Sequence, residues 1–288
     1  MQKPIEQLEL DRIPDLLKEI PDPPSSLRLQ GTLPDYEKRW LTVVGSRDAT
    51  PYGREACQSL IEGLRGYPVV IVSGLAIGID AVAHRAALSA KLLTVAVPGS
   101  GLNERVLYPA ANRGLARDIL EAGGALLSEY PDDFRAAQWT FPKRNRIMVG
   151  LSHAVLIIEA KRRSGTLITA RLATEYNRDV FTVPGSIFSQ NSEGPHMLLR
   201  LGATPVTTSA DILDALGIEP LTDSIGHDLL LLSPQEEEIV ALLSAPMSRD
   251  DLIRQLGKPV HEVNMLLATL ELKGIVKEQY GELRLNVS

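Results

Sequence analysis

The feature that most constrains the fold is an alternation between short apolar runs and stretches of helical periodicity. The apolar runs are rich in Val, Ile and Leu and occupy residues 41–45, 69–74, 92–99, 125–131, 154–160 and 179–185. Helical stretches follow most of them, at residues 52–65, 79–90, 112–122, 166–177 and 193–201. Uninterrupted apolar runs of this length are typical of strands buried on both faces. Their alternation with helices predicts an α/β fold with a doubly wound, mostly parallel sheet.

This pattern also divides the chain. Residues 1–37 precede it as a proline-rich lead-in, which we expect to be either an ordered segment with short helices or a linker from another domain. The alternation predicts one doubly wound α/β domain over residues 38–215. Residues 216–229 contain "IEPLTDSIGHD" and are expected to form a linker to a smaller domain over residues 230–288.

The smaller domain has a different pattern. Its helical stretches occupy residues 234–243, 248–256 and 258–274. The short runs "IVKEQY" and "ELRLNV" follow on either side of Gly281. Three helices and a terminal hairpin predict a winged helix-turn-helix. The third helix would be the recognition helix, but it carries Glu262 and Glu271 against Lys273, so we expect it to contact protein or to bind DNA weakly.

Composition limits the classes of function. The 288 residues carry a formal net charge of −6, which argues against binding polyanions through overall charge but leaves room for a local positive cleft. Cys57 is the single cysteine, so an internal disulfide is impossible, as in most proteins of reducing compartments. No apolar run is long enough to span a bilayer, and the N-terminus lacks a signal-peptide pattern. We therefore expect a cytoplasmic protein.

The ends of the predicted strands are rich in glycine and serine. They read "VGSR" (44–47), "SGLAIGID" (73–80), "PGSG" (98–101), "RRSGT" (162–166) and "PGS" (184–186). In open α/β sheets ligands bind beyond the carboxyl ends of the strands, where backbone N–H groups and helix N-termini receive anions. Several such turns on one edge favour phosphate binding over simple tight connections. The spacing matches neither the dinucleotide fingerprint nor the phosphate loop, which disfavours a classical NAD or ATP site.

Cations and aromatic residues gather near the same edge. "FPKRNR" (141–146) predicts a short basic helix, and "KRRSGT" (161–166) follows an apolar strand. If the ligand is a nucleic-acid strand, such cations would receive its phosphates and aromatic side chains beside them would stack on its bases. Trp139 and Phe141 are candidates for base stacking, although core packing is an equal alternative for Phe141. The predicted binding residues are Ser46, Arg47, Ser73, Gly74, Lys143, Arg144, Asn145, Arg146, Lys161, Arg162, Arg163, Ser164, Gly165 and Thr166.

Signs of catalysis are weaker. Asp80 and His84 share a helix face, either as an acid–base pair or, as we favour, as a helix-start carboxylate and a structural histidine. Glu159 ends a strand and is either a base or, as we favour, the partner of a helix N-terminus or an arginine. No nucleophile has a convincing base, and the histidines show no metal-ligand spacing. We therefore expect no enzyme, no metal and no cofactor.

Taken together, the motifs resemble one family. "VVGSR", "SGLAIGIDAVAH", "LYPAAN", "SEYP", "FPKRNRIMVGLSHAVLIIEAKRRSGTLITARLA" and "VPGS" occur in the order seen in the DprA/Smf family of DNA-processing proteins. The resemblance covers roughly residues 12–215, and the terminal unit is similar to the winged helix of many members. Ile77 stands where the family commonly has arginine, which removes one cation from the predicted cleft.

The resemblance implies a function. Such proteins bind and protect incoming single-stranded DNA, form homodimers through the Rossmann-like domain, and help load the RecA recombinase during natural transformation, the competence-linked recombination of imported DNA. An alternative is a nucleotide-binding enzyme similar to the LOG-like phosphoribohydrolases. Those carry a glutamate after a glycine-rich turn, where "SGTLITA" here has threonine and alanine.

Overall fold

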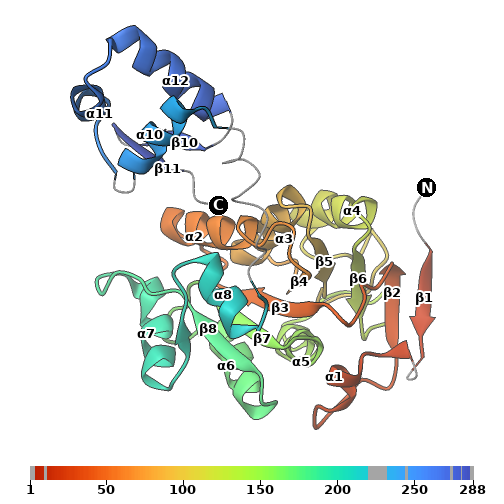
Figure 1. The fold of residues 1–288 in the computed structure, drawn as a ribbon. Coiled ribbons are helices and arrows are strands. Elements are labelled where there is room, and N and C mark those ends of the chain that lie inside the picture. Colours follow the sequence, from red (N-terminus) through yellow and green to blue (C-terminus); the bar gives the residue numbers. More distant parts are fainter. Residues whose placement is uncertain are drawn as a thin grey trace. The chain divides into compact units, whose positions relative to one another are not determined.

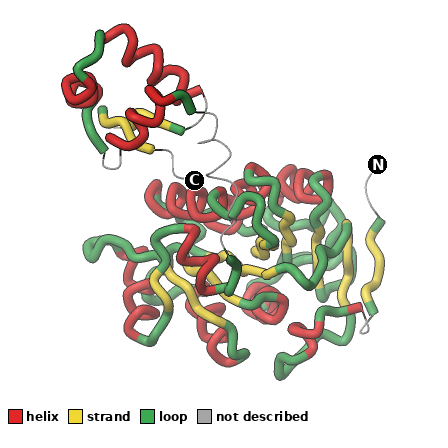
Figure 2. Tube along the Cα trace, viewed as in Figure 1, coloured by secondary structure: helices red, strands yellow, loops and turns green. Residues whose placement is uncertain are grey.

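A computed structural model describes residues 4–9, 12–219, 232–243, 246–272, 275–279 and 281–285 (Figures 1 and 2). The chain divides into two compact units, Met1–Glu219 and Pro220–Ser288. Most of the predicted linker, from residue 220 onward, lies outside the described residues. Lys273 of the predicted recognition helix lies outside them as well.

The first unit is built on a nine-stranded sheet in the order β1-β2-β6-β5-β4-β3-β7-β8-β9, counted within the described residues. The parallel strands from β3 to β9 confirm the predicted α/β class. Their bounds are β3 Arg39–Val44, β4 Val69–Ser73, β5 Leu93–Ala96, β6 Ala125–Ser128, β7 Ala154–Ile157, β8 Asp179–Thr182 and β9 Thr204–Pro205.

Helices cover both faces of the sheet, as Figure 1 shows. One face carries α2 (Pro51–Glu62), α3 (Ile79–Ser89), α4 (Arg113–Glu121) and α8 (Ser209–Ala215). The opposite face carries α1 (Asp15–Lys18), α5 (Thr140–Leu151), α6 (Gly165–Glu175) and α7 (Glu193–Arg200). Short 3₁₀ turns, η2 (Ala110–Asn112) and η3 (Gln190–Ser192), precede α4 and α7.

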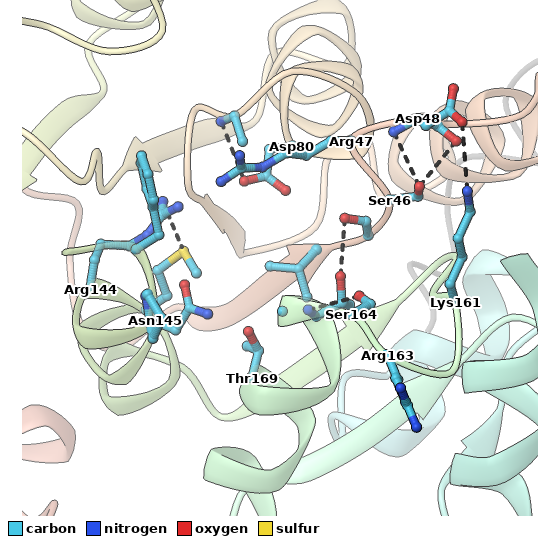
Figure 3. A pocket seen from close by; sticks show the side chains of 18 residues that line it. Ser46, Arg47, Asp48, Asp80, Arg144, Asn145, Lys161, Arg163, Ser164 and Thr169 are labelled. Carbon is cyan, nitrogen blue, oxygen red and sulfur yellow. Dashed lines mark hydrogen bonds and ion pairs between the residues drawn. The ribbon is translucent and has the colours of Figure 1, made fainter. Parts of the chain in front are cut away.

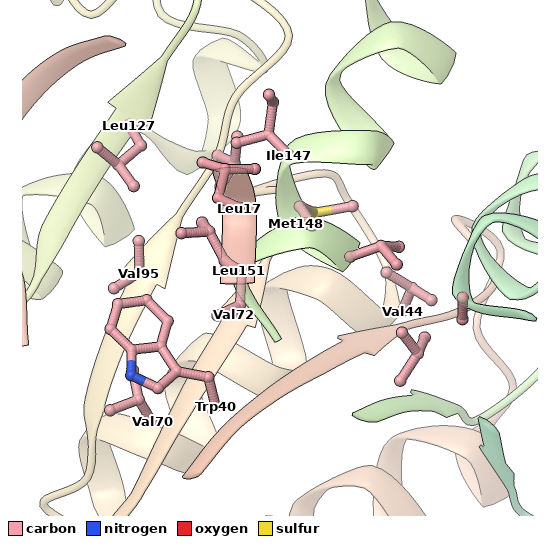
Figure 4. Close-up of a cluster of buried hydrophobic side chains, with 14 of the residues drawn as sticks. Leu17, Trp40, Val44, Val70, Val72, Val95, Leu127, Ile147, Met148 and Leu151 are labelled. Carbon is pink, nitrogen blue, oxygen red and sulfur yellow. The ribbon is translucent and has the colours of Figure 1, made fainter. Parts of the chain in front are cut away.

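Strand alternation explains the two-sided core. Along β3, Trp40 and Val44 pack with α1 and α5, whereas Leu41 and Val43 pack on the other face. Successive side chains of a strand point to opposite faces, so a strand that is apolar throughout feeds both cores. Figure 4 shows the first of these clusters around Trp40.

The lead-in is the main departure from the expected fold. Instead of short helices alone, it contains β1 (Ile5–Leu8) and β2 (Leu27–Gly31), which extend the sheet antiparallel beside β6. Leu8 and Leu29 are buried in the same core as Trp40. The prolines between these strands hid the pattern, because short edge strands tolerate interruptions that break a recognisable periodicity.

The second unit has the predicted winged-helix order. It contains α10 (Pro234–Leu242), α11 (Arg249–Leu256), α12 (Val260–Leu272) and the hairpin β10 (Val276–Gln279) and β11 (Glu282–Leu285). Its own apolar core includes Ile239, Leu252, Leu267 and Leu283. An isolated antiparallel bridge between Met247 and Leu283 adds a second pairing to β11.

Candidate nucleic-acid interface

The sheet order places a pocket at the carboxyl ends of two neighbouring strands. From β3 the chain runs outward through β4, β5 and β6, then returns to β7 on the other side of β3. This is a topological switch point, where the loops diverge and leave a crevice. The crevice has a volume of about 360 Å³ (Figure 3). We call this crevice the cation pocket. Its polar lining comprises Ser46, Arg47, Asp48, Asp80, Arg144, Asn145, Lys161, Arg163, Ser164, Thr166 and Thr169.

Arg47 follows β3 directly, as predicted, and lies exposed at the pocket. Its guanidinium carbon sits 4.9 Å from the centroid of the Phe141 ring, a cation–π contact. No carboxylate within the described residues forms an ion pair with Arg47. Its N–H groups can therefore fork onto a phosphate without giving up a partner.

The turns that carry Ser46 and Arg47 are fixed by the neighbouring "SGLAIGID" turn. The backbone N–H of Ile79 donates to the Ser46 carbonyl at 3.1 Å. Gly78 has a φ of +84°, and a Cβ there would lie 2.2 Å from that carbonyl oxygen. Only glycine permits this approach, so the two strand ends pack together and hold Arg47 at the edge.

The opposite wall is the N-terminus of α6. Ser164 caps the helix, its Oγ accepting the N–H of Thr166 at 3.0 Å. The Thr166 hydroxyl donates to the Gly45 carbonyl at 3.1 Å, which joins this wall to β3. Gly165 is exposed at the first helical position, and a Cβ there would meet no atom within 4 Å. A helix start with an exposed backbone favours an anion through its dipole and free N–H groups.

Three cations precede this helix. Lys161, Arg162 and Arg163 are all exposed, and Lys161 and Arg163 line the pocket. Lys161 lies 3.9 Å from Asp48, whose carboxylate is itself almost fully exposed. Arg162 does not line the pocket. A solvent-exposed pair at this distance contributes little, so the Lys161 ammonium remains available to a phosphate.

Arg144 forms the floor of the pocket and is buried. It donates to the Val97 carbonyl and contacts the Met148 sulfur at 3.7 Å. Burial lowers the pKa of Arg144 to about 10, and the neighbouring Asp80 carboxylate opposes that shift. The guanidinium thus stays charged at neutral pH. Gly74 makes room for it, because a Cβ there would lie 1.8 Å from Nη1.

Asp80 and His84 both have hydrogen-bond partners within the protein, an arrangement consistent with the structural roles that we favoured from the sequence. Asp80 accepts the N–H groups of Gly74 at 3.1 Å and Ala76 at 3.4 Å. Burial raises its pKa, while Arg144 and these N–H groups act against that rise. His84 is fully buried, with Nδ1 at 2.7 Å from the Thr94 hydroxyl. Burial lowers its pKa to about 3, so it is neutral and too far below neutrality to act as a base.

A second, narrower hollow adjoins the cation pocket. It shares Arg47, Phe141 and Arg144 with the pocket and adds Ile77, Tyr108 and Pro109; we call it the apolar slot. Ile77 and Tyr108 are each about half exposed. The rings of Tyr108 and Phe141 lie 5.6 Å apart at 44°. Tyr108 was not among the residues predicted from the sequence. The signal that could have indicated it is its place in the motif "LYPAAN".

The basic knot at 141–146 is split by the start of α5. Arg144 and Asn145 face the pocket, but Arg146 is buried elsewhere, paired with Glu129 and bound to the Asp22 carbonyl of the lead-in. Lys143 is exposed and lies 3.6 Å from Glu129. Helical rotation of 100° per residue explains the split, because adjacent side chains leave a helix in different directions. Lys143 and Arg146 therefore stand outside the pocket, contrary to expectation.

Two other expected residues also lie away from it. Ser73 is fully buried and donates to the Val43 carbonyl at 2.6 Å, a bond between neighbouring strands. Trp139 is exposed but packs edge-on against Tyr130 at 5.8 Å and Phe134 at 5.9 Å, and it lines neither hollow. Phe141 is half-buried, with the Arg47 guanidinium over its ring. Its stacking on a base stays a prediction.

Glu159 has the structural role that the sequence favoured. It is buried and accepts the backbone N–H of Thr50, the cap of α2, at 3.0 Å, and the Asn191 amide at 3.4 Å. With its oxygens engaged it is a helix-start partner. Within the described residues no group of His, Cys, Asp and Glu is arranged to hold a metal ion. No helix of the described chain is long and apolar enough to cross a membrane.

The chain matches known protein families and individual relatives in sequence. Residues 7–217 match the family described as DNA recombination-mediator protein A, and residues 228–282 match the DprA winged helix domain. Protein Smf of Escherichia coli is 41% identical over 271 residues, covering 91% of this chain and 71% of that protein. DNA processing protein DprA of Streptococcus pneumoniae is 44% identical over 197 residues, covering 68% of each chain.

Solved structures agree. The X-ray structure of DprA from Streptococcus pneumoniae superposes with a TM-score of 0.69 at 40% identity, covering 75% of each chain. DNA processing protein A from Helicobacter pylori superposes with a TM-score of 0.66 at 30% identity, covering 75% of this chain and 98% of that one.

Fold and site thus define a Rossmann-like protein with an anion-receptive sheet edge and an appended winged helix. The chain belongs to the DprA/Smf family of DNA-processing proteins.

Proposed function

We propose that the chain binds single-stranded DNA at the carboxyl edge of its sheet, with a phosphate in the cation pocket. The observation that carries this proposal is the set of exposed cations, Arg47, Lys161 and Arg163, that face the capped start of α6 without a close carboxylate partner. Phosphate contacts of this kind supply most of the sequence-independent affinity for nucleic acids. The solved structure of the related Helicobacter pylori protein is described as giving insight into its single-stranded DNA binding mode, which supports the same ligand here.

The apolar slot suggests where a base goes. A base beside the bound phosphate would contact Tyr108 and Ile77, with Arg47 and Phe141 between the slot and the pocket. A base is free to enter such a slot only when it is unpaired. Single strands should therefore bind better than duplexes of the same sequence.

The revised set of DNA contacts is smaller than the sequence suggested. It keeps Arg47, Ser46, Gly74, Arg144, Asn145, Lys161, Arg163, Ser164, Gly165 and Thr166 around the two hollows, with Arg162 at the rim and Phe141 as a partial platform. Ile77 narrows the slot with an apolar wall, so this chain relies on the cations of the α6 side for phosphate attraction.

The test is competition between single-stranded and duplex DNA. Fluorescence anisotropy of a labelled oligothymidylate is followed while unlabelled single strand or duplex is added, at several salt concentrations. We expect the single strand to compete at least tenfold better, and log K to fall linearly with log salt by about 0.7 per phosphate contact. Equal competition by duplex would refute the proposal.

Three further parts of the proposal concern the partner protein, the oligomeric state and catalysis. We propose that the bound strand is protected and handed to the RecA recombinase, in the cytoplasm and in natural transformation where the host takes up DNA; the family name supports the recombination role. We propose a homodimer through the α/β unit, whose β9 leaves a sheet edge open. We also propose that the protein acts without catalysis, since Asp80, His84 and Glu159 are all engaged structurally. Light scattering would report the mass, and RecA ATPase on single strands would report the hand-over.

A further inference from the structure

The loop between β8 and α7 carries an unusual apolar tip. Phe188 is 92% exposed and Ile187 is 79% exposed, the most exposed large apolar side chains among the described residues. A ring left almost wholly in water forgoes the free energy that burial would provide. Two adjacent side chains of this kind on one turn form a small apolar surface that a ligand can cover.

This tip is held in place by its own loop. The N–H of Ser189 donates to the Ser186 carbonyl at 3.0 Å, and the N–H of Phe188 donates to the Ser186 hydroxyl at 3.2 Å. A ring nitrogen of His196 lies 3.0 Å from the Gly185 carbonyl oxygen. These bonds form a closed turn, so the two apolar side chains are presented to solvent by an ordered backbone.

The loop is anchored to the rim of the cation pocket. Asn191 donates to the Asp48 carbonyl at 3.1 Å, and its own carbonyl accepts the N–H of Ala160 at 2.8 Å. Tyr52, in the first turn of α2, donates to the Pro184 carbonyl at 2.5 Å. Asp48 lines the pocket and Ala160 precedes Lys161. Figure 3 shows the ribbon of this part of the chain, in pale teal, on the Lys161 side of the pocket.

We propose that Ile187 and Phe188 form a second base-stacking platform, beyond Lys161, for the same DNA strand. This inference rests on the proposed function and extends it. Single-strand binders place aromatic side chains along a positive path, so that successive bases stack while their phosphates meet cations. The Phe141–Tyr108 slot serves one side of the pocket, and the tip serves the other.

Charge decides in favour of a nucleic acid as the occupant. The exposed side chains on the segment next to the anchored loop are Lys161, Arg162 and Arg163. Two exposed carboxylates oppose them, Asp48 among the anchors and Glu193 at the start of α7, against three cations. A base that stacks on Phe188 brings its phosphate toward this basic run, which is favourable. An apolar protein partner would gain nothing from those cations.

The experiment uses the full chain and a series of oligothymidylates from a length that fills only the pocket to one several times longer. Phe188→Ala removes the ring, Phe188→Trp keeps it, and Met265→Ala is the control because it trims an exposed apolar side chain of the other unit. We expect Phe188→Ala to weaken binding of long oligonucleotides on the order of tenfold, with short ones and the salt slope unchanged, since stacking releases no counterions. Phe188→Trp should bind like the parent chain, and its added fluorescence should be quenched only by the longer oligonucleotides.

The outcomes separate this inference from the proposed function. If the parent chain binds no single strand, the proposed function fails. If the parent binds and Arg47→Ala weakens it, while Phe188→Ala is unaffected at every length, this inference alone fails. A Phe188→Ala chain that weakens equally at all lengths and changes its mass by light scattering would show instead that the tip is a contact between copies, and would overturn the platform.

Discussion

The sheet edge of the α/β unit and helix α12 of the winged-helix unit are both elements that bind nucleic acids in other folds, but their cations differ in availability. At the edge, Arg47, Arg162 and Arg163 have no carboxylate partner within the described residues, and Lys161 has a distant one. Four of the five described cations in the winged unit are paired with a carboxylate: Arg249, Arg254, Lys258 and Arg284.

This difference shows that whether a cation is paired with a carboxylate says more about DNA binding than the presence of a helix-turn-helix motif. Arg249 binds Glu278 at 2.6 Å and Glu271 at 3.4 Å, so the cation next to α12 is held by its own unit. A phosphate that binds Arg249 would have to displace these carboxylates. They would then lie unpaired beside another negative charge. The helix-turn-helix shape alone therefore predicts less about DNA binding than the free cations of the edge do.

The largest expected effect separates a buried cation from an exposed one inside the basic knot, both of them partners of Glu129. Arg146→Ala removes the buried partner of the partly buried Glu129 and the bond to Asp22. Breaking a buried pair costs about 3–5 kcal/mol. We expect urea denaturation to show a loss of that size, with DNA affinity retained where the variant is folded. Lys143→Ala is the matched control, since it shares Glu129 but is exposed, and should cost less than about 1 kcal/mol. A selective loss of DNA affinity in Arg146→Ala would return Arg146 to the interface.

The second effect concerns a buried titratable group of the α/β unit. His84 lies beneath the sheet edge with a pKa lowered to about 3, against about 6.5 in an unfolded chain. Below about pH 6.5 the unfolded state therefore binds a proton at His84 that the native state does not bind. The free energy of unfolding falls as the pH is lowered through this range. Between pH 7.5 and 5 the α/β unit should lose about 2 kcal/mol from this group.

Thermal melts across this pH range would measure that loss. His84→Asn keeps a polar atom near the Thr94 hydroxyl and removes the titration, so its melting temperature should depend less steeply on pH than that of the parent. Identical slopes for the two chains would show that another group governs the acid response.

A third, smaller effect tests the free cation of the edge directly. Arg47→Ala should weaken single-strand binding about tenfold, because a charge-assisted hydrogen bond to phosphate contributes about 1.5–3 kcal/mol. It should also reduce the salt slope by about 0.7. Arg249→Ala, in the winged unit, is the control and should leave both quantities unchanged. Equal losses in both variants, by anisotropy, would erase the contrast between the two regions.

The smallest effect concerns the winged unit as a whole. Removing residues 220–288 should change single-strand affinity by less than about threefold, because four of the five described cations there are engaged by carboxylates. A loss of tenfold or more would mean that this unit contributes contacts to the strand. Affinity measured at equal salt for the two chains decides between them.

The sequence by itself determined the parallel part of the sheet in the first unit and the order of elements in the second. Apolar runs between helices specified the parallel sheet, and the glycine-rich strand ends specified the edge that receives an anion, because both depend on local periodicity and backbone freedom. Arg47 and the "KRRSGT" segment could be placed on that edge for the same reason: each follows a strand directly.

Only the tertiary structure decided which cations are free. Nothing local to "FPKRNR" separates Arg144, which floors the pocket, from Arg146, which is bound to Glu129 and to Asp22 of the lead-in. Those partners lie 17 and 124 residues away along the chain. The same holds for Tyr108 beside Phe141, and for Phe188, whose loop reaches the pocket rim through Asn191 and Asp48. Strand periodicity is written in neighbouring residues, whereas the pairing of charges depends on contacts that exist only once distant segments have packed together.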